Sequence, residues 1–219
     1  MSKTYTFDSK FELGEELPNF TQDEVKNEPM LFNCDFNAAW HLGGPITKAF
    51  LTNSLHNNSQ CLPCVVDTRI HMLMPGWFPC IPGFHHDDVP RRLSDSQPDY
   101  DSPAYHAQHI MALVNGDICP TEFAVGKMIL PEIPMGEIIY KKWHPIVDAM
   151  CNINIDVKRV SVPTNRLIHF DAHAMHQGVR AVKGGWRWFG RITYKSDRKI
   201  TNEIRRQVQV YLEFPMEGW

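Results

Sequence analysis

The stretch Pro79-Cys-Ile-Pro-Gly-Phe-His-His-Asp-Asp-Val-Pro-Arg91 places two histidines beside two aspartates, in a frame of prolines and aromatic residues. A strand projects residues i and i+2 to the same side. His85 and Asp87 are therefore predicted to face one way. His86 and Asp88 are predicted to face the other. Either pair offers one imidazole and one carboxylate to a single metal ion, and the rest of the chain must supply a third ligand.

The third ligand is predicted in the alternating segment 166–176. If this segment is one strand, Phe170 and His176 share an inward, mostly apolar face, and His173 points outward. A turn near Ala172 would change that phase and make His173 the alternative ligand. Two imidazoles and one carboxylate form the facial triad typical of non-haem Fe(II) oxygenases, whereas structural zinc sites favour four protein ligands.

The neutral imidazoles of such a site need partners on their second ring nitrogens. Three polar residues close in sequence are candidates for that role: Asp88, Asp171 and Gln177.

An arginine follows His176 on the next predicted strand, in the segment Gly-Trp-Arg187-Trp-Phe-Gly-Arg191. A guanidinium group binds a carboxylate through two parallel hydrogen bonds. Arg187 is the first candidate for such a clamp. Arg191 is the alternative, because it shares a face with Arg187.

This ordered set, His85-x-Asp87, His176 and then Arg187, resembles the iron(II)/2-oxoglutarate-dependent dioxygenase superfamily. The local sequences around these residues are similar to those of members from bacteria and their phages. The resemblance covers roughly residues 65–195. It implies a mainly-β double-stranded β-helix, a cupin-like jelly roll, with a few flanking helices. It also implies Fe(II) held by the triad, and 2-oxoglutarate as co-substrate with its distal carboxylate on Arg187 or Arg191.

The activity implied by the resemblance is O₂-dependent oxidation of a small-molecule or nucleotide-like substrate, with release of succinate and CO₂. No catalytic residue beyond the metal ligands is expected. Asp87 argues against a halogenase, which has a small residue at the carboxylate position. The candidate substrate-binding residues are Arg69, Arg91 and Trp77.

Two other functions fit the same residues. A metal-dependent cupin of another reaction type, an isomerase or a lyase, would use the triad without the arginine clamp. A non-catalytic β-sandwich binding module would use the cluster for structure or for incidental metal binding. Turnover of 2-oxoglutarate to succinate would distinguish the dioxygenase from a cupin of another reaction type. Loss of metal without loss of fold in Asp87→Ala would favour either enzyme over the binding module.

Composition predicts one domain over residues 1–219 that is rich in strands and loops. The chain is 43% hydrophobic and has 16 prolines and 13 glycines, which allows a substantial core but does not suit a helix bundle. A net charge of −3 gives no global attraction to nucleic acid, although a local basic groove is compatible with it. No apolar run suggests a signal peptide or a membrane span, so a cytoplasmic protein is expected. A monomer and a homodimer are both compatible with the apolar end 214–219.

Residues 1–60 are expected to wrap the domain and to contain a helix at 46–55 that starts after Pro45, and residues 65–214 to form the catalytic core. Alternation or β-propensity predicts strands at 65–74, 105–114, 121–130, 186–194 and 207–214. Asn115-Gly116 predicts a hairpin turn. Pro145 favours a helix beginning near Trp143.

Two remaining stretches carry weaker signals. Residues 93–104 read as a surface loop, either a lid or a connector. Cys61 and Cys64 form a lone CxxC and are expected to be ordinary thiols.

Overall fold

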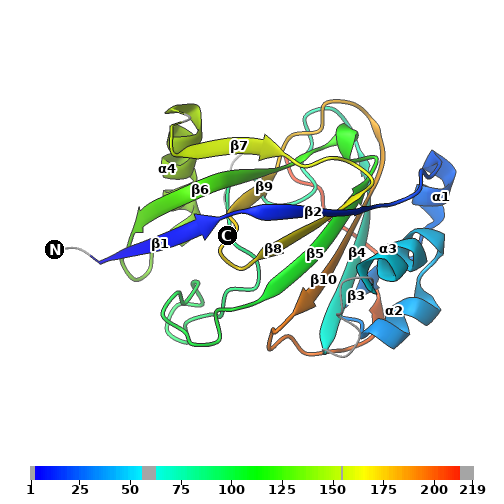
Figure 1. Ribbon diagram of the computed structural model, residues 1–219, viewed down its shortest axis with the longest axis horizontal. Helices are drawn as coiled ribbons and strands as arrows, with labels where there is room; N and C mark the ends of the chain where they lie inside the picture. The colour runs from blue at the N-terminus through cyan, green and yellow to red at the C-terminus, as the bar shows by residue number, and fades with distance from the viewer. Residues whose placement is uncertain (1–2, 56–62, 154, 213–219) are drawn as a thin grey trace.

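Two antiparallel sheets face each other in the computed structural model, which describes residues 3–55, 63–153 and 155–212 (Figure 1). The larger sheet has the order β2 (Phe11–Glu16), β8 (Arg166–Asp171), β5 (Gln108–Val114), β10 (Gly185–Tyr194), β4 (Cys64–Leu73). The smaller sheet has the order β1 (Thr4–Ser9), β6 (Thr121–Pro131), β7 (Val157–Ser161), with β9 (His176–Gly178) also paired to β6. The expected mainly-β fold is confirmed, and the jelly-roll arrangement stays a prediction.

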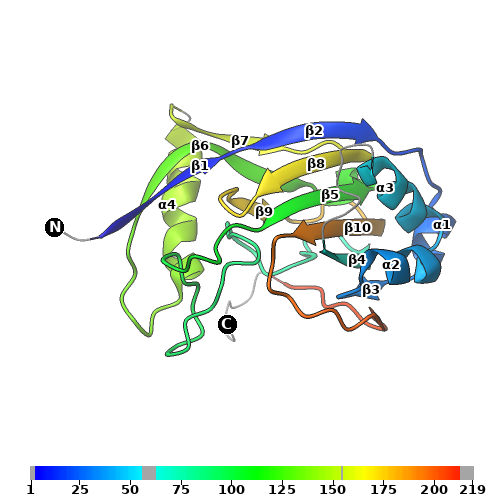
Figure 2. The same cartoon turned by 60° about the horizontal axis from the view of Figure 1, so that its bottom comes forward.

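Helices cover the outer sides of both sheets (Figures 1 and 2). On the larger sheet lie α1 (Gln22–Asn27), α2 (Phe36–Leu42) and α3 (Pro45–Leu55). On the smaller sheet lies α4 (Ile139–Ile153). The remaining elements are the short pair β3 (Leu31–Phe32) and β11 (Glu203–Ile204) and the 3₁₀ turn η1 (Gly116–Ile118). No helix in the described ranges is both long and apolar enough to cross a membrane.

Alternation along β4 and β10 gives the larger sheet one apolar face and one polar face. Val66 and Ile70 of β4 pack with Trp188 and Ile192 of β10 in the core beneath α1–α3. Gly190 lies between those two β10 residues because an added Cβ would come within 2.1 Å of the Trp188 ring. The opposite face of both strands points between the sheets and carries the charged residues.

The space between the sheets is filled at one end by apolar side chains and left open at the other. The apolar cluster is made by Met111, Leu113, Phe123, Val162, Ile168, Phe170 and Ala174. The polar residues of β4 and β10 line the open end of this space, next to the apolar cluster.

The N-terminal wrapping segment contains more helix than the sequence predicts. The expected helix at 46–55 is confirmed as α3, which begins one residue earlier, at Pro45. The additional helices α1 and α2 are capped at their N-termini by Thr21 and Asp35, whose side chains accept hydrogen bonds from the backbone amides of Glu24 and Ala38. These caps satisfy the free amides of two helices that are too short to show a clear apolar period.

The predicted hairpin at Asn115-Gly116 is wrong. β5 and β6 follow each other in sequence but belong to different sheets. Asn115 has the positive φ (55°) that favoured the turn, yet the chain continues into η1 and crosses from one sheet to the other. A local turn signal reports backbone conformation and does not report which strand is the partner.

Two other boundaries also differ from expectation. Residues 166–176 are not one strand, because the chain turns after Asp171 and β9 joins the smaller sheet. α4 begins at Ile139 rather than near Trp143, with Pro145 inside it. Pro145 is exposed, whereas the stripe Ile139, Trp143, Val147 and Cys151 is buried, so packing of that stripe outweighs the missing hydrogen bond.

The predicted strand 207–214 is not formed in its described part, residues 207–212. Tyr211 makes one bridge to Phe78, and Val210 and Leu212 are exposed. Phe214 and the apolar end lie outside the described residues, as does Cys61. Cys64 is a buried free thiol. Residues 93–104 form no helix or strand, as predicted.

Candidate metal site

An isolated antiparallel bridge, made of two backbone hydrogen bonds, brings the two histidines of the predicted triad together. The amide of His85 donates to the carbonyl of His176 at 2.9 Å, and the amide of His176 donates to the carbonyl of His85 at 3.0 Å. His176 is placed by β9, which pairs with β6 at Phe123. The loop that carries His85 is anchored by the buried Phe84, whose amide donates to His144 Nδ1 at 3.1 Å.

His85, Asp87 and His176 point their ligand atoms at one another. These atoms all lie within 4.8 Å of one another. Asp87 Oδ2 is 3.2 Å from His176 Nε2, and Asp87 Oδ1 is 3.9 Å from His85 Nε2. Two imidazoles and one carboxylate therefore converge as a metal site requires, although His85 forms only an isolated bridge rather than a long strand.

Backbone carbonyls orient both imidazole rings. His85 Nδ1 is 2.9 Å from the carbonyl of Gly83, and His176 Nδ1 is 2.9 Å from the carbonyl of Ala174. A carbonyl oxygen only accepts, so each Nδ1 carries a proton and each Nε2 is directed at Asp87. The three side chains predicted for this role have other partners: Asp88 binds arginines, Asp171 accepts from the His173 amide, and Gln177 donates to Glu122.

The protonation states suit a cation between these groups. Burial lowers the pKa of His85 to about 4, helped by the charge of His176, so its imidazole is neutral at pH 7. Burial acts to raise the pKa of Asp87, but the charges of Arg191 and His176 outweigh it and hold that pKa well below its ordinary value. The site therefore offers a neutral imidazole and an ionised carboxylate at physiological pH.

The alternative ligands point elsewhere. The ring of His86 lies 4.6 Å from that of Phe7, and its Nδ1 is 2.9 Å from the Tyr100 hydroxyl. Asp88, at a positive φ of 51°, pairs instead with Arg191 and Arg198. His173 stacks on Tyr105 at 5.0 Å. The structure brings together the triad at His85, Asp87 and His176, and not the shifted pair or His173.

Arg187 and Arg191 share the interior face of β10, as predicted, but differ in their partners. Arg191 contacts Asp87 and lies 3.3 Å from Asp88. Burial acts to lower the pKa of Arg191, yet these carboxylates outweigh it and raise that pKa. Its charge is thus already compensated.

Arg187 is equally buried, and Nη2 donates to the hydroxyl of Thr121 at 3.2 Å. Its Nε has no hydrogen-bond partner, and no carboxylate of the described chain pairs with it. Burial lowers the pKa of Arg187 below its ordinary value. Among the described residues, Arg187 is thus a buried cation without a counter-ion, and it lies beside the triad.

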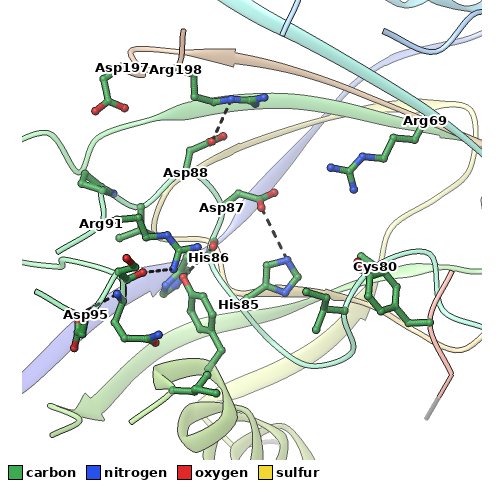
Figure 3. A pocket seen from close by; sticks show the side chains of 18 residues that line it. Arg69, Cys80, His85, His86, Asp87, Asp88, Arg91, Asp95, Asp197 and Arg198 are labelled. Carbon is green, nitrogen blue, oxygen red and sulfur yellow. Dashed lines mark hydrogen bonds and ion pairs between the residues drawn. The ribbon is translucent and has the colours of Figure 1, made fainter. Parts of the chain in front are cut away.

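Two adjoining cavities meet at the triad. The smaller, about 100 Å³, lies between the sheets and is lined by His176, Thr121, Arg187 and Phe189. The larger, about 970 Å³, opens beyond the loop and is shown in Figure 3. The lining residues that the two cavities share are Arg69, Cys80, His85 and Asp87.

Two of the three candidate substrate-binding residues line the cavities, and the third does not. Arg69 lines both cavities, and Arg91 lines the larger one. Trp77 lines neither of them and packs against a small apolar cluster that includes Leu73 and Ile118. Arg69 and Arg91 therefore remain substrate-binding candidates, whereas Trp77 serves packing.

Tyr140 lies at the candidate site although it was not predicted there from the sequence. Its hydroxyl donates to the His86 carbonyl at 3.0 Å and accepts from the Tyr100 hydroxyl at 3.0 Å, so it holds the backbone between two triad residues. It also lines the larger cavity. Tyr140 lies in the helical segment whose start was misplaced, and nothing in its sequence neighbourhood marks it as part of a site.

No family model and no curated protein matches this chain. Two solved structures of HygX from Streptomyces hygroscopicus, one with iron bound and one apo, are 13% identical to it. Each alignment covers 87% of this chain and 83% of the other, with a TM-score of 0.37. A likeness of this degree does not identify a function, so the site is interpreted from its own geometry.

Proposed function

We propose that this protein is a non-haem Fe(II)- and 2-oxoglutarate-dependent dioxygenase that oxidises a small molecule. The observation that carries the proposal is the pairing of two features in one small cavity: the converging triad and the buried, uncompensated Arg187. The triad fits a divalent metal, and Arg187 fits a ligand that brings a negative charge to that metal.

The donor set favours iron over a structural metal. Two imidazoles and one carboxylate occupy one side of an ion and leave positions for exogenous ligands, whereas structural zinc is closed by four protein ligands. Within the described chain, His85, Asp87 and His176 form the one candidate cluster of this kind. Iron held there would supply oxygen activation coupled to decarboxylation of the co-substrate.

Arg187 supports 2-oxoglutarate as that co-substrate. A buried guanidinium is costly without a counter-ion, and a carboxylate satisfies it bidentately. Arg187 is proposed to bind the distal carboxylate of 2-oxoglutarate with the hydroxyl of Thr121, while the keto-acid end lies toward the triad. Arg191 stays on Asp87 and orients that ligand, so the two arginines have different roles.

The decisive test is anaerobic titration of the purified protein with Fe(II) and 2-oxoglutarate, followed by visible absorption. We expect a charge-transfer band that requires both components. His176→Ala abolishes the band, and the matched control His173→Ala keeps it, because His173 stacks on Tyr105 outside the triad. Metal binding without a band would favour another cupin chemistry, and no metal binding would remove the triad from consideration.

A further inference from the structure

Arg69 occupies an unusual place at the meeting point of three cavities. It lies on β4, opposite Phe189 of β10, with its side chain in the interior. It lines the small cavity with Arg187 and the large cavity beside the triad. It also lines a third cavity of about 360 Å³ that it shares with Arg205. No other residue lines all three of these cavities.

Arg69 has no counter-ion within the described residues. Its Nε is buried without a hydrogen-bond partner. By contrast, Arg191 and Arg198 are both paired with aspartates. The surroundings of Arg69 are cationic as well: burial lowers the pKa of Arg187 and of Arg205, and the charge of Arg69 lowers both further.

Within the described residues, the buried Arg187 and the half-buried Arg69 therefore both lack a carboxylate partner beside the triad, and the co-substrate supplies only one carboxylate for them. Under the proposed function, the distal carboxylate of 2-oxoglutarate goes to Arg187 and its other carboxylate goes to the metal. Arg69 is left over. It faces the cavity of about 970 Å³, which is large enough for a second small molecule.

A second cation lies across the same cavity. Figure 3 shows Arg91 and Arg69 on opposite sides of His85 and Asp87. Arg91 donates to the carbonyl of Ser96 at 3.4 Å, and no carboxylate in the described ranges pairs with it. A ligand placed over the triad thus has on either side a guanidinium group that no carboxylate of the described residues neutralises.

We propose that the primary substrate is a small-molecule anion whose carboxylate or phosphate group binds Arg69 beside the metal, with Arg91 receiving a second polar or acidic group. This inference rests on the proposed function for its reaction. It adds the chemical class of the substrate, which the triad and Arg187 do not define.

The test uses inorganic phosphate as the probe and calorimetry as the readout. The full-length protein is titrated first without metal, and then with Mn(II) and saturating 2-oxoglutarate so that Arg187 is occupied. Arg69→Gln is compared with Arg166→Gln, a matched control on β8 that donates to the Gly14 carbonyl and lines none of these cavities.

Without 2-oxoglutarate, phosphate can bind at Arg187 as well as at Arg69. With Mn(II) and 2-oxoglutarate present, we expect the wild type and Arg166→Gln to bind phosphate and Arg69→Gln to bind it at least about tenfold more weakly, the loss of one charge-assisted contact. Equal binding by Arg69→Gln, or no binding by the wild type, would overturn the proposal. Full displacement of phosphate by 2-oxoglutarate would also overturn it, because Arg69 would then serve the co-substrate.

Thermal unfolding keeps the result interpretable. Arg69→Gln removes a half-buried charge that has no counter-ion among the described residues, so its Tm without phosphate is expected to equal or exceed that of the wild type. Phosphate should raise the Tm of the wild type and not that of Arg69→Gln. A phosphate-dependent rise in both proteins would count against Arg69 as the anion site.

Failure of this inference differs from failure of the proposed function. A charge-transfer band without Arg69-dependent phosphate binding would leave an oxygenase with a neutral or cationic substrate. Arg69-dependent phosphate binding by a protein that gives no band would leave an anion-binding site and remove the oxygenase.

Discussion

At the scale of single residues, Arg187 and Arg191 differ in their partners, and under the proposed function this difference gives them different roles. Both are buried on one face of β10, but only Arg191 is compensated by aspartates. Truncating Arg187 should therefore affect the co-substrate, whereas truncating Arg191 should release Asp87.

Arg187→Gln is predicted to raise the KM for 2-oxoglutarate by roughly ten- to a hundredfold, since a hydrogen bond to a charged group is worth about 1.5–3 kcal/mol. Succinate formation at varied 2-oxoglutarate measures it. Arg92→Gln is the control, because Arg92 pairs with Asp95 and lies outside the small cavity. An unchanged KM in Arg187→Gln would show that the clamp lies elsewhere.

The triad was predictable from sequence at this scale, and its supports were not. His85, Asp87 and His176 follow from residue type, spacing and order. The doubled motif could not be resolved, because alternation applies equally to His86 and Asp88. Their separation depends on the positive φ of Asp88 and on the Tyr100 hydroxyl, which are tertiary features.

At the scale of elements, β10 combines a packed outer face with a charged inner face. Gly190 allows the Trp188 ring to fold over the strand, and this ring packs with Phe50 of α3 at 5.5 Å. The packing holds β10 in the register that places both arginines in the interior.

Gly190→Ala is predicted to destabilise the protein by about 1–3 kcal/mol, the usual cost of overpacking a core. Urea unfolding measures the change. Gly184→Ala is the matched control beside the same strand, where an added Cβ has its nearest neighbour at 3.6 Å. Equal stabilities of the two variants would show that the Trp188 ring moves aside without cost.

Elements were predictable where the signal was local and continuous. β4, β10 and α3 were found because alternation or a proline start coincides with packing. The misplaced start of α4 and the false hairpin at Asn115 share one cause: partner choice between sheets outweighs local turn and proline preferences. Residues 207–212 alternate in sequence as a strand would, but in the structure this segment pairs only at Tyr211 and joins none of the sheets.

At the scale of the whole molecule, the charged interior makes stability depend on pH. Burial, with the charges of Arg187 and Arg69, lowers the pKa of His71 to about 3 from 6.5. Between these values the unfolded chain binds more protons than the folded protein, so the free energy of unfolding rises with pH.

The wild type should therefore lose stability as pH falls from about 6.5 toward about 3, with His71 contributing at most about 1.4 kcal/mol per pH unit. His71→Asn is expected to flatten this dependence in urea unfolding at several pH values. His41→Asn, on an exposed helical position, should leave it unchanged. A dependence equally steep in His71→Asn would exclude this residue as a source.

The pairing of His85 with His176 has a consequence for how the protein is made. Asp87 and His176 are 89 positions apart in sequence, so a ribosome completes the first half of the triad long before the second. A nascent chain that ends before His176 contains only His85 and Asp87, and two ligands do not hold a metal ion firmly. Under the proposed function, iron would therefore bind only after translation, once β9 has joined the smaller sheet, and a chain released before β9 would lack the site.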